Sequence, residues 1–117
     1  PGRVRVLHAP QAGDAAAPTA VFDAPLTGHR FDTTLEVTGY AVDNRRIATI
    51  EGYLDGAFIG SVRPGRFDLR ARNLFPTAPY AGNLGFTANF DTAAFAAGNY
   101  TFTARVYDTA GNVTVYT

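Results

Sequence analysis

The sequence predicts an all-β protein built from two packed antiparallel sheets with about seven strands. Three observations support this fold class. Apolar and polar residues alternate with a period of two in many short segments, and Gly, Asp, Asn and Pro separate these segments. No window sustains the spacing of apolar residues that an amphipathic helix needs. A length of 117 residues fits a single domain of this kind.

The composition narrows the classes of function. Ten basic and ten acidic residues give no net charge, so we expect no binding of nucleic acid and no insertion into a membrane. The absence of cysteine excludes disulfides, thiolate metal sites and cysteine nucleophiles. No apolar run approaches the ~20 residues of a membrane-spanning helix. The chain starts at Pro1 and contains no methionine, so we expect an excised or processed module. Separately, no cofactor is expected.

The first part of the chain is expected to hold a linker and the first strands. The alanine-rich segment 11–20 has helical propensity, but Pro10 and Pro18 bracket it and Gly13 interrupts it, so a loop or linker is predicted. Strands are predicted at 3–8, 19–23 and 33–43. The last of these places four residues on one face, Leu35, Val37, Gly39 and Ala41, and three on the other, Glu36, Thr38 and Tyr40.

A hairpin is predicted in the middle of the chain. Strands at 47–55 and 57–62 flank Asp55-Gly56, the preferred dipeptide of a type I′ turn because both of its residues need positive φ. In this register Tyr53 lies opposite Phe58. The first strand of the hairpin places Ile50, Gly52 and Leu54 on one face and Glu51 and Tyr53 on the other.

Three more strands are predicted at 84–91, 99–108 and 112–117. A polar turn at 108–112 connects the last two, and Gly111 there can adopt left-handed φ. The strand at 99–108 directs four residues to the core, Tyr100, Phe102, Ala104 and Val106, and four outward, Thr101, Thr103, Arg105 and Tyr107.

The segment 63–83 breaks the alternation. It contains four arginines and three prolines, and its apolar residues argue against disorder, so we expect an ordered excursion packed on the sandwich. Together with the N-terminal segment it is expected to protect the edge strands. We expect Arg66 to pair with Asp68 and fix this excursion. The alternative is that its arginines bind an anionic polysaccharide.

Several motifs resemble one known family. They are "GYAVD" at 39–43, "IATIEGYLDGAFIGSV" at 47–62 and "FDTAAFAAGNYTFTARVYDTAGNVT" at 90–114, together with Arg66-Phe67-Asp68 and Phe75-Pro76 in the long middle segment. This pattern resembles the immunoglobulin-like modules of bacterial exported multidomain proteins, over roughly residues 31–117. The resemblance implies an immunoglobulin-like (Ig-like) β-sandwich with a long irregular loop in the middle of the chain. Residues 1–30 are expected to be an N-terminal linker plus a first strand of the same domain.

Two positions depart from the family pattern. The aromatic residue at Tyr40 is usually bulkier in the resembling modules. Gly52 lies where the resembling modules more typically carry a β-branched residue. We expect the space beside it to be filled by a neighbouring side chain such as Ile59.

Outward-facing aromatic residues are the main candidates for ligand binding. Tyr53, Phe58 and Tyr107 are expected on one outer face, with Glu51 and Arg105 as polar neighbours, and Tyr116 joins them in one arrangement. Sugar rings stack on such aromatic faces, which predicts a carbohydrate platform. The alternative is that these aromatics only stabilise neighbouring strands or are covered by the long loop, and that alternative carries more weight.

Other candidate residues have mainly structural explanations. Tyr100 follows a corner between strands, where a tyrosine hydroxyl bonds to upstream backbone. The turns at Asp43-Asn44 and Asp108–Asn112 could converge to bind calcium, although turn hydrogen bonding is the favoured account. A metal site at His8, His29 and Asp32 is disfavoured. Ser61 lacks the surroundings of a nucleophile, so no catalytic residue is predicted.

The leading functional hypothesis is a non-catalytic spacer module of a secreted or cell-surface bacterial protein, as the resemblance implies. Its partners would be the neighbouring domains of the same polypeptide. The first alternative is a carbohydrate-binding module that uses the outer aromatic face. The second is a protein-interaction or adhesion module that uses the arginine-rich loop.

Overall fold

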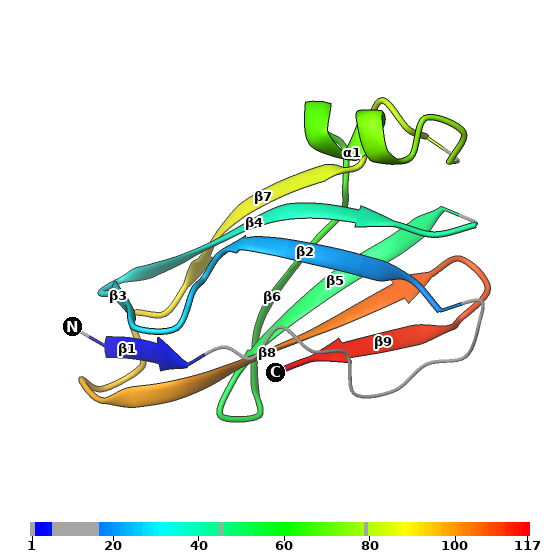
Figure 1. Cartoon of the computed structure of the whole chain (residues 1–117). Helices are drawn as coiled ribbons and strands as arrows, with labels where there is room; N and C mark the ends of the chain where they lie inside the picture. The colour runs from blue at the N-terminus through cyan, green and yellow to red at the C-terminus, as the bar shows by residue number, and fades with distance from the viewer. Residues whose placement is uncertain (1, 6–16, 45, 79) are drawn as a thin grey trace.

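Two stacked β-sheets form the molecule, as Figure 1 shows for the computed structural model. The structure describes residues 2–5, 17–44, 46–78 and 80–117. Its elements are β1 (Gly2–Arg5), β2 (Thr19–Ala24), β3 (His29–Phe31), β4 (Thr34–Val42), β5 (Ile47–Leu54), β6 (Ala57–Val62), α1 (Leu69–Leu74), β7 (Gly85–Asp91), β8 (Asn99–Asp108) and β9 (Val113–Tyr116). The large sheet has the order β3-β1-β8-β5-β6, with β9 also paired to β8, and the small sheet has the order β2-β4-β7.

The predicted all-β sandwich is confirmed, with two differences in detail. The described part of the chain holds nine strands, and the short β3 was not predicted. The sheets are also not purely antiparallel, because β1 runs parallel to the first part of β8. The second part of β8 pairs with β9 along the same edge, so β1 covers the remainder of that edge, as expected of the N-terminal segment. The remainder of the strand predicted at 3–8, and most of the predicted linker, lie outside the described residues.

The hairpin of β5 and β6 has the predicted turn. Asp55 and Gly56 have φ of 48° and 82°, as a type I′ turn requires. Tyr53 pairs with Phe58, and a bulge beyond them brings Gly52 opposite Gly60. The carboxylate of Asp55 connects this turn to the next strand, because its Oδ1 accepts from the backbone N–H of Thr101 in β8, at 2.7 Å.

A phenylalanine of the opposite sheet fills the space beside these two glycines. A Cβ atom on Gly52 would lie 2.9 Å from the ring of Phe90, and one on Gly60 would lie 2.7 Å from the same ring. Phe90 is buried in β7 and belongs to the main core. The expectation that Ile59 fills the gap is therefore wrong. Ile59 packs against the core, but the ring that reaches the glycine pair comes from across the sandwich.

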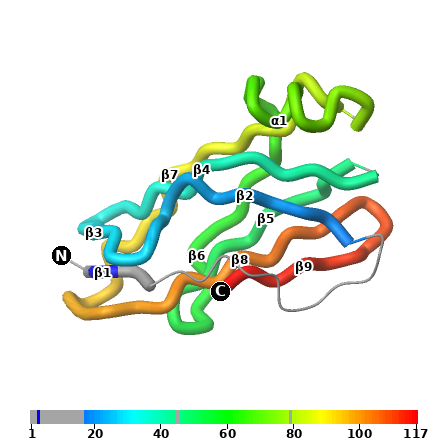
Figure 2. Tube along the Cα trace, viewed as in Figure 1, coloured from blue at the N-terminus to red at the C-terminus, as the bar shows by residue number. Residues whose placement is uncertain are grey.

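Both open sides of the sandwich carry connections between the sheets. On one side, the hydroxyl of Tyr116 in β9 accepts from the backbone N–H of Ala20 in β2 at 2.7 Å, and the Thr114 hydroxyl donates to Pro18 O at 2.5 Å. On the other side, the chain leaving β6 forms a bridge to β7. Arg66 and Gly85 exchange backbone hydrogen bonds of 2.8 and 2.9 Å there. These bonds thus join the strand edges of the two sheets on both sides. Figure 2 shows the backbone of the two stacked sheets.

The long middle segment packs on the sandwich, as predicted, and it does so over Tyr40 and Val42 on the outer face of the small sheet. It was not expected to be helical, yet it contains the six-residue helix α1. Asp68 caps this helix by accepting from the backbone N–H of Ala71 at 3.1 Å. Ala71 is fully buried against Tyr40 and Leu84, in a second apolar cluster outside the main core. A helix this short spans less than the window over which apolar periodicity is recognised.

Candidate functional site

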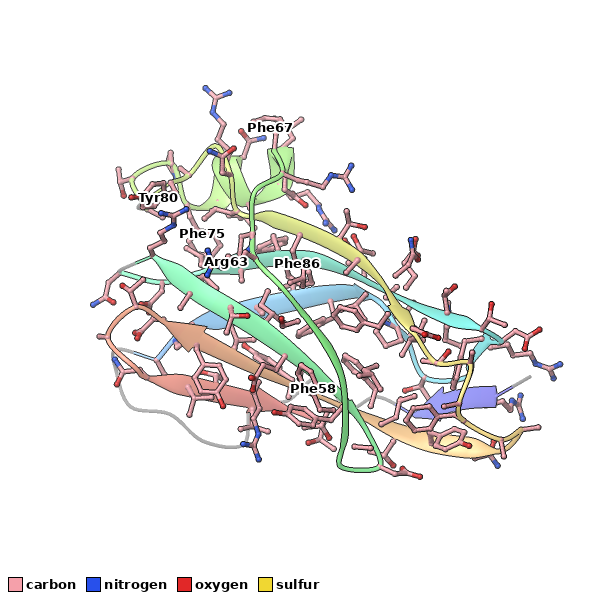
Figure 3. All side chains as sticks on the ribbon, turned by 180° about the vertical axis from the view of Figure 1, so that it is seen from behind. Phe58, Arg63, Phe67, Phe75, Tyr80 and Phe86 are labelled. Carbon is pink, nitrogen blue, oxygen red and sulfur yellow. The ribbon has the colours of Figure 1, made fainter. Side chains whose placement is uncertain are left out.

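The predicted aromatic platform exists as a group of neighbouring side chains on the outer face of the large sheet. We call the five residues Glu51, Tyr53, Phe58, Arg105 and Tyr107 the outer-face cluster. Pairing of β5 with β6 and β8 creates it, because Tyr53 lies opposite Phe58 and Glu51 lies opposite Arg105. The rings of Tyr53 and Phe58 are 5.7 Å apart in an edge-to-face arrangement. Phe58 is 58% exposed and projects from the edge hairpin (Figure 3).

The polar groups of the outer-face cluster are already bonded to its aromatic members. The Tyr53 hydroxyl donates to Glu51 Oε1 at 2.8 Å, and the guanidinium of Arg105 lies 5.3 Å from the centre of the Tyr53 ring. The hydrogen bond to Glu51, then burial, raises the pKa of Tyr53. A hydrogen bond with Tyr107 is the main reason that the pKa of Arg105 is raised. These contacts favour a stabilising role between strands, since a sugar would have to compete for the same groups.

Tyr116 does not join this surface. It is 4% exposed and points between the sheets, where burial raises the pKa of its hydroxyl. The register explains its direction, because Tyr116 lies opposite Ala104, a core residue of β8. A turn that spans 108–112 places Tyr116 opposite Ala104, so the predicted turn already implied that Tyr116 points inward.

Tyr100 has the structural role that its position predicted. Its hydroxyl donates to the backbone carbonyl of Ala96, four residues upstream. Its ring packs against Phe95 and Phe31 at 5.4 and 5.9 Å between ring centres. The corner that leads into β8 is therefore fixed by one tyrosine.

The ion pair predicted in the middle segment has a different cation. Asp68 pairs with Arg70 at 2.9 Å, and the same guanidinium binds both oxygens of Asp23 in β2, at 2.9 and 2.6 Å. The expected pairing of Arg66 with Asp68 is wrong. Arg66 acts through its backbone, which bonds to Gly85. Arg70 can reach Asp23 because the helix turn directs it across the face of β4, over the ring of Tyr40.

The two turns considered for calcium do converge, since Asp43 is among the neighbours that lower the pKa of Asp108. Asp108 Oδ1 accepts from the backbone N–H groups of Ala110 and Asn112 at 2.8 and 2.9 Å, and its Oδ2 accepts from the Asn112 amide at 3.0 Å. Burial of Asp108 opposes its ionisation, but hydrogen bonds led by those from Asn112 keep its pKa below the ordinary value. This is the turn chemistry expected as the alternative to calcium.

The remaining candidates stay separate. Across the part of the chain that the structure describes, no three His, Cys, Asp or Glu side chains gather closely enough to hold a metal ion. His29 is half-buried in β3, Asp32 is exposed after it, and His8 lies outside the described residues. Ser61 is an exposed residue of β6. None of the helices described is long and apolar enough to span a bilayer.

One further polar surface is not indicated by the local sequence. Arg46, at the start of β5, places its guanidinium 4.7 Å from the centre of the Tyr80 ring at the end of the middle segment. Tyr80 has φ of 58°, a left-handed conformation in which tyrosine is uncommon. The local sequence Tyr80-Ala81-Gly82 does not indicate a left-handed backbone at Tyr80, because its glycine stands two residues after that position.

Comparison with known proteins identifies the class of domain. A family model described as the bacterial Ig domain matches residues 18–104. The chain belongs to this family, and its two-sheet structure is the Ig-like β-sandwich that the resemblance implied. The matched range starts before residue 31, so the likeness includes β2 and β3. No curated protein and no solved structure matches the chain.

Membership of the bacterial Ig domain family indicates the general class of protein to which this chain belongs. Bacterial Ig domains typically occur in surface or exported proteins, which makes this chain a module of the surface-protein type. Domains of this family are generally non-catalytic.

Proposed function

We propose that this chain is a non-catalytic spacer that holds neighbouring domains of an exported or cell-surface bacterial protein at a fixed separation. The observation that carries the proposal is the connection of the two sheets on both open sides, through Tyr116 and Thr114 on one side and the Arg66–Gly85 bridge on the other. Such connections resist sliding of one sheet over the other. The molecule is elongated, with extents of 43 × 26 × 19 Å, which suits a spacer.

The first measurement tests whether the module is rigid, and the second tests whether it fixes the distance between its neighbours. Because the chain has no cysteine, Arg30→Cys with Thr109→Cys gives one pair of spin-label sites, in β3 and in the β8–β9 turn. We expect a narrow distribution of label distances. In the parent polypeptide, replacing this module by a Gly/Ser linker of equal mean length should broaden the distances between its neighbours, because such linkers behave as flexible coils. An unchanged distribution in that second measurement would contradict the spacer proposal.

A carbohydrate-binding role for the outer-face cluster is the second candidate. The observation that favours it is the exposure of Phe58 beside Tyr53 and Tyr107 on one uncovered face. A glycan array with the parent chain and with a Tyr53→Ala/Tyr107→Ala double variant tests it. Retention of every bound glycan by the double variant would exclude the platform.

A further inference from the structure

Two small hollows adjoin each other at the corner of the sandwich where β5 begins and the chain leaves β6. The first, of about 140 Å³, has Tyr80 and Asn83 on its walls, and the second, of about 170 Å³, has Arg63 and Thr109. Both are bordered by Arg46, Ile47 and Pro64, so they form one surface, which we call the corner groove. Figure 3 shows Arg63 and Tyr80 at this end of the molecule.

The corner groove carries positive charge without a carboxylate of its own. Arg46 and Arg63 are exposed, and none of the described residues lining the two hollows is acidic. The ion pairs within the described chain involve Arg70 and neither of these two arginines. Two guanidinium groups presented in this way suit carboxylates, which arginine binds through two parallel hydrogen bonds.

Tyr80 adds a feature that simple charge attraction does not explain. A non-glycine residue is strained in the left-handed region, and such strain is often kept where it serves a function. Here it holds a ring that is 55% exposed beside the Arg46 guanidinium. The backbone carbonyl of Tyr80 accepts from Asn83 N–H at 2.7 Å, which fixes this turn and leaves the Asn83 amide at the groove.

We propose that the corner groove binds an acidic polysaccharide. Arg46 and Arg63 pair with the carboxylates of uronate sugars, the exposed ring of Tyr80 packs on a sugar ring, and the Asn83 amide bonds to hydroxyl groups. An acidic peptide would use the two arginines but would leave the strained aromatic without a role. The site is distinct from the outer-face cluster, where the Glu51 carboxylate already accepts a hydrogen bond from the Tyr53 hydroxyl.

Binding to defined polymers tests the ligand class. Isothermal titration of the chain uses polygalacturonate and alginate, with methyl-esterified polygalacturonate as a polymer of the same rings without charge and poly-glutamate as one of charge without rings. We expect binding to at least one free-acid polysaccharide, weakening as salt rises, and much weaker binding to both controls. Equal binding of poly-glutamate, or binding to neither polyuronate, overturns the proposal.

Matched variants locate the site. Arg46→Gln and Arg63→Gln should each weaken binding by about tenfold, as loss of one charge-assisted contact implies. Arg30→Gln removes the same charge in β3, at the far end of the molecule (Figure 1), and should leave binding unchanged. Equal weakening by all three would show diffuse charge attraction and overturn the site.

Tyr80→Gly separates binding from folding. Glycine adopts positive φ freely, which offsets the greater freedom of the unfolded chain and the lost contact with Arg46, so this variant should unfold at about the same temperature as the parent while its affinity for the polyuronate falls by about tenfold. Undiminished affinity would remove Tyr80 from the site. The spacer proposal needs no ligand, so it does not depend on either result.

Discussion

The outer faces of the two sheets carry similar residues but differ in what covers them. On the small sheet, Tyr40 and Val42 point outward and are each only 8% exposed, because α1 and the segment after it pack over them. On the large sheet, Tyr53 and Tyr107 also point outward and are only partly buried, with the exposed Phe58 beside them. The same two-residue alternation thus yields a second apolar core on one sheet and an open surface on the other. The difference is made by a segment that has no alternation at all.

Placing a charge between α1 and the small sheet should have the largest effect on stability. Ala71→Asp puts a carboxylate at a fully buried position against Tyr40 and Leu84, and an unpaired buried charge costs about 3–5 kcal/mol. We expect urea denaturation to show a loss of that size. Asn73→Asp adds the same charge on an exposed turn of α1 and serves as the control. If the two variants are equally stable, α1 does not pack on the small sheet.

Truncating one tyrosine on each outer face tests the comparison directly. Tyr40→Ala should lower the free energy of unfolding by about 3 kcal/mol, as expected for a buried aromatic residue. Tyr53→Ala removes an edge-to-face pair and a hydrogen bond on the open surface, and about 1 kcal/mol is expected. Equal losses in thermal or chemical denaturation would mean that the two faces are covered alike.

Removing Arg70, the cation that connects α1 to β2 of the small sheet, should have a smaller effect on stability. Arg70→Ala loses a two-oxygen contact with Asp23, a contact with Asp68 and the covering of Tyr40, for which about 1 kcal/mol is expected at low salt. Arg66→Ala is the matched control and should change stability little, because the described contacts of Arg66 are made by its backbone. A larger loss for Arg66→Ala than for Arg70→Ala would restore the pairing predicted from sequence.

Acidification should give the smallest effect. The hydrogen bond from Arg70, against the opposing effect of burial, keeps the pKa of Asp68 below its ordinary value. A carboxyl whose pKa is lowered by folding stabilises the protein fully above its unfolded pKa of about 3.9 and loses this contribution as the pH falls through the folded pKa. Asp68→Asn keeps a helix-capping side chain without the charge. The stability advantage of the parent, below about 1 kcal/mol at pH 7, should therefore begin to decline in urea titrations as the pH falls below about 4 and be lost once the pH is below the lowered pKa of Asp68, and an advantage that does not change with pH would contradict this account.

Local sequence rules succeeded where the interactions they describe are local. The Asp55-Gly56 turn follows from backbone sterics, and the Tyr100 hydroxyl bonds within four residues. The predicted hairpin register and strand order also place Tyr53, Phe58 and Arg105 together, as the structure does. The role of that cluster in binding stays a prediction.

Errors arose where contacts span the chain. Tyr116 bonds to Ala20, 96 residues away, and Phe90 fills the space at Gly52 from the opposite sheet. Arg70 was passed over because its partner Asp23 lies on another strand, 47 residues earlier. A spacing rule cannot choose among four nearby arginines when the deciding carboxylate comes from elsewhere.

The sequence by itself determined most of the strands, the hairpin turn and the inward direction of most core residues, because backbone sterics and a two-residue side-chain period act over a few neighbouring positions. Only the tertiary structure decided which outer face is covered, which cation binds Asp68, and that Arg46, Arg63 and Tyr80 border one groove. These outcomes depend on close packing between segments far apart in the chain, where many pairings satisfy the same local pattern and the complementary shapes of the sheets select one.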